Sequence, residues 1–256
     1  MKKLILILLI PFISHVFLLA QTGNGTIGNP YTGTISGTLT WYADNYPNGI
    51  IYAQNITIAS GASLTISPGQ YNGCHLQFAH ATTLTINSGG SFTINPQTSV
   101  TVDNIVNNGS LTLESYPNES GVASLYHSNY SGAGTTVTRL YLSGGTTAEG
   151  NYKWHYISVP VNNVSATSFS TLDLAQYIEN LVVNEENESG WVAYDGYRYS
   201  TELITGPTFS TLELGKGYNY YSASGSTFSL SGNLNIQGIE VPVTCGTGYP
   251  NSQGFN

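Results

Sequence analysis

Residues 84–102 read LTINSGGSFTINPQTSVTV, and this stretch decides the fold. It holds three triplets of the form apolar-Thr-apolar, which begin eight residues apart at Leu84, Phe92 and Val100. In an extended strand the first and third residues of a triplet face one way and the Thr faces the other. The triplets therefore predict short strands that bury aliphatic side chains on one face and carry a row of Thr on the other.

The same triplet recurs on both sides of this stretch, beginning at Ile56, Leu64 and Leu111. The pair at 56 and 64 returns at 84 and 92, so a period of 28 residues accompanies the eight-residue spacing. Turns rich in Gly, Ser and Asn separate the triplets, at 60–63, 88–91 and 107–110. Strands this short are stable only when stacking buries their apolar faces.

Two architectures satisfy this pattern. One is a β-solenoid with triplets on flat sides and Gly turns at corners, and the other is a series of antiparallel hairpins with the same turns. The even spacing favours a short right-handed β-solenoid-like repeat domain over residues 21–115. Residues 21–55 are its predicted N-terminal cap, with Trp41 and Tyr42 covering the open end of the stack.

The character of the sequence changes after residue 115. We expect residues 116–149 to be a connecting segment, and residues 150–256 to form a mostly antiparallel β-sandwich-like domain rich in aromatic strands. One helix is predicted over 172–181, because Leu174, Ile178 and Leu181 are spaced i, i+4, i+7. The chain as a whole is predicted to be all-β.

Residues 1–20 read as a cleaved secretory signal peptide. Lys2 and Lys3 precede an apolar run that ends at the small residue Ala20. No later segment is apolar enough to span a bilayer, which predicts a secreted, extracellular or outer-surface protein. After cleavage only four basic residues remain against 14 acidic ones, so nucleic acid is excluded as a partner. Those four are Arg139, Lys153, Arg198 and Lys216.

Taken together, the repeats and several later segments resemble Bacteroidetes secreted surface proteins of the type IX secretion class. Besides the opening repeats, the resemblance rests on segments 121–125, 136–139, 143–145, 154–161, 214–218 and 228–235. It implies a β-solenoid stalk followed by a sandwich-like module, and it supplies no catalytic residues. It also implies an N-terminal fragment that lacks the C-terminal sorting domain. The apolar stretch 241–245 would then be a last strand without its partner, exposing an edge.

The sequence offers no constellation for catalysis, and we expect no enzyme activity. Residues 50–115 contain no Lys or Arg, whereas lyases on a β-solenoid need a basic residue on one face. His75 and His80 are five apart, and so fall on opposite faces of an extended strand. No cofactor is expected, apart from weak Ca²⁺ binding by the acidic stretch 185–188. Whether Cys74 pairs with Cys245 is left open.

The Tyr-rich second domain carries the candidate binding residues. Exposed Tyr rings stack on sugars and donate hydrogen bonds, which suggests glycan contacts at Tyr194, Tyr197, Tyr199, Tyr218 and Tyr220. Ordinary strand packing is the alternative reading of the same residues. The leading functional hypothesis is a non-catalytic structural or adhesive module of the cell surface. The second is a carbohydrate-binding module, and the possible partners are extracellular glycans or surface proteins.

Overall fold

The computed structural model describes residues 20–70, 73–117, 121–145, 153–169, 173–178, 191–194, 197–198, 202–203, 209–222 and 224–234. The chain is nearly all β, with a β-solenoid of about four turns followed by antiparallel sheets. The predicted all-β class and the order of its two parts are therefore confirmed. The signal peptide up to residue 19, the acidic stretch 185–188 and the expected last strand at 241–245 lie outside the described residues.

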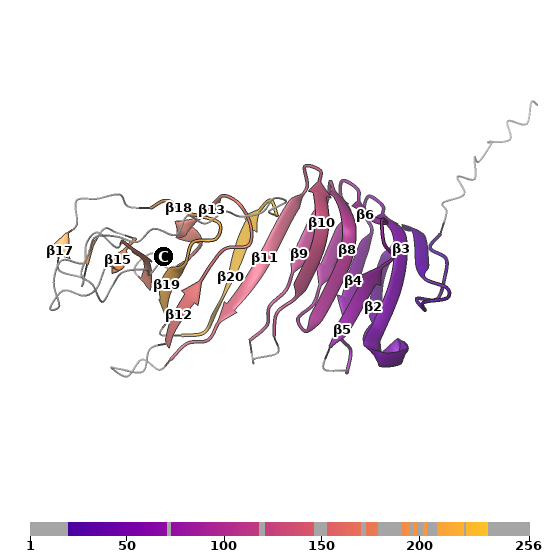
Figure 1. Cartoon of the computed structure of the whole chain (residues 1–256), viewed down its shortest axis with the longest axis horizontal. Coiled ribbons are helices and arrows are strands. Elements are labelled where there is room, and N and C mark those ends of the chain that lie inside the picture. The colour runs from indigo at the N-terminus through magenta and orange to yellow at the C-terminus, as the bar shows by residue number, and fades with distance from the viewer. Residues whose placement is uncertain are drawn as a thin grey trace, which may run out of the picture.

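Two parallel sheets form the solenoid, and their strands stack along the long axis of the molecule (Figure 1). One sheet contains β1 (Tyr31–Ile35), β3 (Ile50–Ile58), β5 (Cys74–Phe78), β6 (Thr83–Ile86), β8 (Thr98–Asn107) and β10 (Ser124–Ser131). The other contains β2 (Thr38–Tyr42), β4 (Ser63–Ser67), β7 (Ser91–Ile94), β9 (Ser110–Leu113) and β11 (Thr135–Leu142). All these neighbours pair in parallel, so the hairpin alternative is wrong.

One turn of the coil accounts for the 28-residue period. Ile56 of β3 pairs with Leu84 of β6, and Leu64 of β4 pairs with Phe92 of β7. The eight-residue step within each coil carries the chain from one sheet to the other. The 28-residue period is thus the number of residues in one coil, and the eight-residue period is the number of residues from a triplet in one sheet to the next triplet in the other.

The triplets face as predicted. Leu84 and Ile86 are fully buried, while Thr85 between them is half-buried. The same alternation holds at every triplet from β3 to β9. The core of the solenoid is therefore a set of aliphatic columns, and burial of this apolar area is the main force that holds the coils together.

Each coil has two kinds of corner. At the tight corners Gly61 and Gly89 adopt φ of 75° and 78°. These values lie in the left-handed region, which residues other than Gly disfavour. At the wide corner two successive residues face outward, as at Gln54 and Asn55 in β3. This break in the alternation bends the first sheet and lets β3 pair with both β5 and β6.

The first coil is filled by aromatic rings. Trp41 is buried and stacks on Tyr31 with ring centroids 4.4 Å apart, and the Tyr31 and Tyr46 hydroxyls lie 2.6 Å apart. Tyr42 is half-exposed, because its side chain alternates with that of Trp41 along β2. Trp41 therefore fills the coil from inside, while Tyr42 faces outward. A backbone pair between Thr22 and Thr32 covers part of the β1 edge.

The predicted connecting segment instead supplies the last coil. β10 pairs in parallel with β8, and β11 pairs in parallel with β9. The solenoid thus continues to Leu142, some way past the expected boundary at residue 115. The segment lacks the apolar-Thr-apolar triplets because it is an end coil. In the described structure β10 is paired on one side only, and the far side of β11 is paired with the antiparallel strand at 226–232 and not with another coil.

The second region is built mainly from antiparallel strands. Its largest sheet has the order β12 (Lys153–Ile157), β19 (Tyr218–Ser222), β14 (Leu174–Tyr177) and β15 (Trp191–Ala193). Two small pairs, β13 (Val164–Ser165) with β18 (Thr211–Leu212) and β16 (Tyr197–Arg198) with β17 (Glu202–Leu203), flank it. The helix predicted over 172–181 is wrong for its described part, because β14 pairs with both β19 and β15.

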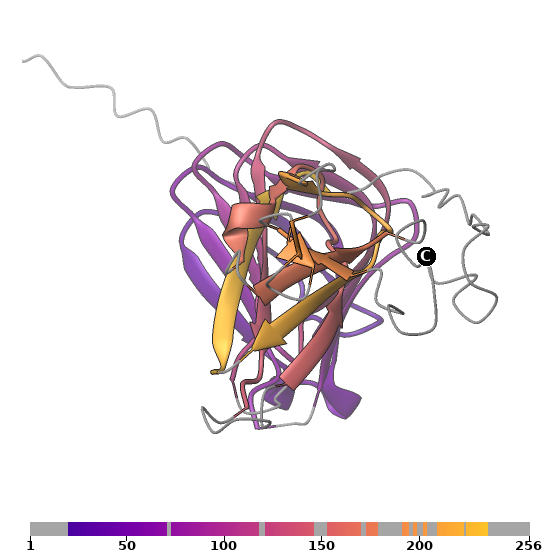
Figure 2. The same ribbon diagram turned by 90° about the vertical axis from the view of Figure 1, so that its left-hand side faces the viewer.

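A single strand joins the two regions. β20 (Ser226–Gly232) runs antiparallel along β11 and so extends the second solenoid sheet. Buried residues of the coils and of the second region form one continuous cluster, in which Leu230 is fully buried. Figure 2 looks along the stack from the side of the second region, with the coils behind it.

Candidate binding surface

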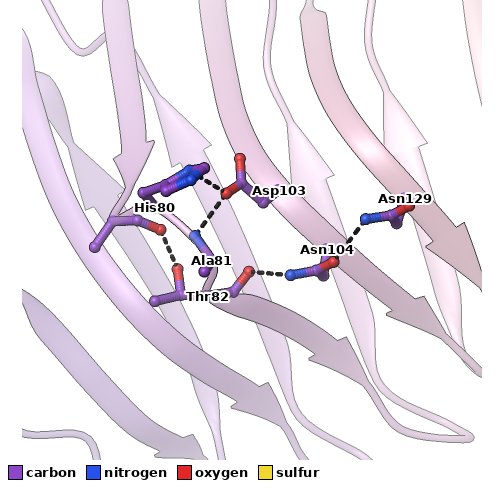
Figure 3. A network of polar contacts seen from close by, with 7 residues as sticks. His80, Ala81, Thr82, Asp103, Asn104 and Asn129 are labelled. Carbon is purple, nitrogen blue, oxygen red and sulfur yellow. Dashed lines mark hydrogen bonds and ion pairs between the residues drawn. The ribbon is translucent and has the colours of Figure 1, made fainter.

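The wide corners of the solenoid carry a polar ladder on their outer side (Figure 3). The Asn129 amide donates to Asn104 Oδ1 at 2.9 Å, and the Asn104 amide donates to the Thr82 carbonyl at 3.2 Å. In the same corner Asp103 accepts the backbone N–H of Ala81 at 2.6 Å. These contacts link successive coils and satisfy the backbone where the chain bends, so the ladder has a structural role.

His80 and Asp103 lie in direct contact at this corner. The His80 Nδ1 to Asp103 Oδ2 distance is 2.6 Å, and the His80 side chain is 95% exposed. His75 lies apart on β5, where its Nδ1 is 2.6 Å from Ser99 Oγ. Within the described ranges, no three His, Cys, Asp or Glu side chains are grouped as a metal site. The structure thus separates the two histidines.

A pocket of about 420 Å³ lies where the coils meet the second region. His127 and Thr138 line it from β10 and β11. They occupy inward positions, with His127 next to Val102 and Thr138 next to Leu113. Their Nδ1 and Oγ1 atoms are buried without a hydrogen-bond partner in the described structure. Burial lowers the pKa of His127. A few bound waters would satisfy these groups, and a pocket of this size has room for them.

Two of the five predicted glycan-contact residues are core residues, and a third, Tyr194, is partly buried against the core. Tyr218 and Tyr220 lie in β19 and are buried, with Tyr218 packed on Phe209 and Tyr220 on Phe169. Tyr194 packs edge-to-face on Phe209, with ring centroids 5.7 Å apart. Burial raises the pKa of Tyr218, and its hydroxyl accepts the Glu213 N–H at 2.8 Å. The prediction is corrected for Tyr218 and Tyr220, because a fully packed ring offers no face to a sugar.

The remaining two predicted residues give no geometry for a site. Tyr197 belongs to β16, and the structure describes its backbone alone. Tyr199 lies outside the described residues, as does Cys245. Cys74 is a buried free thiol, and burial raises its pKa to about 12.

The opposite face of the same sheet presents aromatic rings to solvent. Trp154 and Tyr156 on β12 are 63% and 78% exposed, and the alternate residue Ile157 is buried. Strand pairing places Tyr221 beside Trp154, and Asn219 beside Tyr156, on this outer face. Continuing across the sheet, the register adds four outward residues, which are Ala175, Tyr177, Trp191 and Ala193. We call these eight residues the aromatic face.

Ring contacts hold the aromatic face together. The Trp154 and Tyr221 ring centroids are 4.6 Å apart, and those of Tyr177 and Trp191 are 5.3 Å apart. Tyr156 and Trp191 come from the two outer strands of the sheet, yet their centroids are only 6.0 Å apart. The two rings therefore reach toward each other across the central strands β19 and β14.

Asn219 lies in the centre of the aromatic face, on β19. It is 7% exposed, and its Oδ1 atom has no hydrogen-bond partner in the described part of the chain. A buried amide oxygen without a donor is costly, and such atoms are uncommon in native proteins. The site is thus a set of apolar rings around one unsatisfied acceptor, flanked by the small side chains of Ala175 and Ala193.

The sequence does contain a signal for this face. Exposure alternates over residues 154–157, and the two-residue period of a strand places Trp154 and Tyr156 together on one side. Grouping Tyr residues because they are close in the sequence instead combines residues from both faces of β19. Only the strand register shows that Tyr221 belongs to the aromatic face, while Tyr218 and Tyr220 belong to the core.

Comparison with known proteins finds no family model, no curated protein and no solved structure that significantly matches this chain. No helix among the described residues is long and apolar enough to cross a membrane.

Proposed function

We propose that this chain is a non-catalytic, secreted module of the cell surface, with a structural and adhesive role. In this proposal the solenoid is a rigid spacer, and the aromatic face of the second region makes the contact. The observation that carries the proposal is the β11–β20 ladder, which builds the second region directly onto the end of the coils. A contact surface fixed in this way keeps its orientation relative to the spacer.

The stacked coils support the role of spacer. Each coil is tied to the next by a parallel backbone ladder, by aliphatic columns inside, and by the Asn contacts at the wide corners. Such an arrangement resists bending far better than a linker without packed secondary structure.

The proposal of a surface location rests on the sequence. The basic start and apolar run of residues 1–20 are typical of a signal for export, and the resemblance to type IX surface proteins points the same way. The absence of Lys and Arg from residues 50–115 supports a role without lyase activity, because lyase chemistry on a solenoid face needs a basic residue.

Carbohydrate binding is the second candidate function. It is favoured by the exposed rings of Trp154 and Tyr156, since exposed aromatic rings that are grouped on one face, unlike single ones, are typical of contact surfaces. The two candidates are compatible, because an adhesive module needs a ligand on the opposing surface.

Export and accessibility test the proposed function directly. In a bacterium with type IX secretion, we expect the full chain, joined at its C-terminus to a type IX sorting domain, to be cleaved by protease added to intact cells. A variant lacking residues 2–19 is the control and should stay protected. Purified chain should also release no reducing sugar from a panel of polysaccharides. A chain that remains protected in both forms, or that turns over a polysaccharide, would contradict the proposal.

A further inference from the structure

We propose that the aromatic face binds a neutral hexopyranose chain, with Trp154 and Tyr156 as the stacking rings and Asn219 as the central polar contact. The inference rests on the proposed function and names the ligand class and the residues that bind it. It moves the glycan contact from the Tyr positions predicted by sequence to the other side of the same sheet.

The two exposed rings determine the kind of ligand. An aromatic ring has a negative face, which attracts the slightly positive C–H groups that line one side of a hexopyranose. Trp154 and Tyr156 are two residues apart on one strand, so their attachment points are about 6.7 Å apart. Two rings at this spacing fit successive units of a chain better than a single sugar.

The rings are already held in place before a ligand arrives. Trp154 contacts Tyr221 at 4.6 Å between centroids, and Tyr156 contacts Trp191 at 6.0 Å. Side chains that are packed on one side lose less conformational freedom when a ligand covers the other side. The aromatic face is therefore a preorganised platform.

Asn219 supplies the directional contact. Its Oδ1 atom is buried without a donor beside the exposed Tyr156 ring. A small turn of the Tyr156 ring, which is 78% exposed, would open the amide to a sugar hydroxyl while the Trp154–Tyr221 pair stays in place. A hydroxyl donating to Oδ1 would satisfy this buried acceptor, so a polyhydroxylated ligand fits better than a hydrocarbon.

Charge selects a neutral ligand. None of the eight residues of the aromatic face is charged, and the chain has a formal net charge of −8. Acidic polysaccharides would meet long-range repulsion with no local cation on the platform to offset it. A neutral hexopyranose chain meets no such penalty.

The test is titration of the full chain with cellohexaose and mannohexaose, followed by calorimetry and by Trp fluorescence, with hexagalacturonate as the acidic comparison. We expect at least one neutral hexasaccharide to bind and the acidic one not to bind. Trp154→Ala and Tyr156→Ala should each weaken binding about tenfold, as the loss of one stacked ring predicts. Asn219→Ala should weaken it by a similar factor.

Tyr126→Ala is the matched control, since Tyr126 is 67% exposed but lies on β10 in the solenoid. This variant should bind like the unaltered chain. The inference is overturned if neither neutral hexasaccharide binds, if only the acidic one binds, or if Tyr126→Ala weakens binding as much as Trp154→Ala. It is also overturned if Trp154 and Tyr156 instead support a dimer in sedimentation.

These outcomes are separable from failure of the proposed function. A chain that is exported and accessible but binds no glycan would retain the surface role and lose the ligand. Turnover of a bound hexasaccharide would contradict the non-catalytic role while leaving the binding site in place.

Discussion

Ile86 and Thr85 are adjacent in the sequence but lie in opposite environments. The Ile86 side chain is fully buried in an aliphatic column, while Thr85 faces out of β6. We expect Ile86→Asp to destabilise the chain by about 4 kcal/mol or more, because a carboxylate would be buried without a partner. Thr85→Asp should cost no more than about 1 kcal/mol. Equal thermal midpoints for the two variants would contradict the assigned faces.

Two partly buried histidines make the stability depend on pH. Burial lowers the pKa of both His75 and His127 below the usual 6.5. The unfolded chain therefore takes up protons first, so this contribution to stability is present above pH 6.5 and is lost as the pH falls below it. Urea denaturation at pH 8 and pH 5.5 should show a smaller pH effect in a His75→Gln/His127→Gln double variant. An unchanged pH effect in that variant would show that other groups are responsible.

The aromatic residues show how far sequence reasoning reaches at the scale of single residues. Abundant Tyr in the second region correctly predicts strands, since aromatic side chains favour the pleated surface. It does not distinguish a ring in the core from a ring in solvent. Tyr220 and Tyr221 are neighbours, yet they face opposite sides of β19, and pairing with β12 decides which side is exposed.

At the scale of elements, the wide corner is held by one carboxylate. Asp103 accepts the Ala81 N–H and also contacts His80. Asp103→Ala should cost about 1 kcal/mol, because the backbone N–H loses its charged acceptor and Ala81 has a left-handed φ of 61°. His80→Ala should change the stability by much less, since a contact made by a side chain that is 95% exposed contributes little. If His80→Ala proved as costly as Asp103→Ala, the His80 contact and not the backbone contact would stabilise the corner.

The elements that the sequence predicts best are those with strict alternation. The six triplets predict both the strands and their buried faces, because stacking repeats the same environment in each coil. The last coil has no triplets, and its inward positions include His127 and Thr138 beside a pocket. The pattern that identifies the other coils is therefore missing from it.

The helix prediction for segment 172–181 is wrong for a different reason. Leu174 and Ile178 satisfy a helical spacing, but four residues of β14 satisfy an alternating one equally well, with Leu174 and Gln176 buried. Hydrogen bonding to β19 on one side and β15 on the other decides in favour of the strand. Local spacing does not contain that information.

At the scale of the whole molecule, the coils and the second region share one core, and we expect them to unfold together. Leu230 of β20 is fully buried between them. Leu230→Ala should cost about 2–5 kcal/mol. The loss should lower the unfolding midpoint reported by Trp41 in β2 as much as that reported by Trp154 in β12, each measured in a single-Trp background. A Trp41 transition that stays in place would show that the coils are an independent unit.

The number of coils sets the length of the solenoid. Neighbouring strands in a sheet lie about 4.8 Å apart, so four such steps from β2 to β11 measure about 19 Å. Because β20 runs antiparallel to β11, it ends the parallel register on that side of the stack. Adding or removing one coil would therefore change the distance from the first coil to the aromatic face by about 4.8 Å. On a flexible tether a contact surface would lie at a range of distances. In this chain the distance from the first coil to the aromatic face is set by the number of coils.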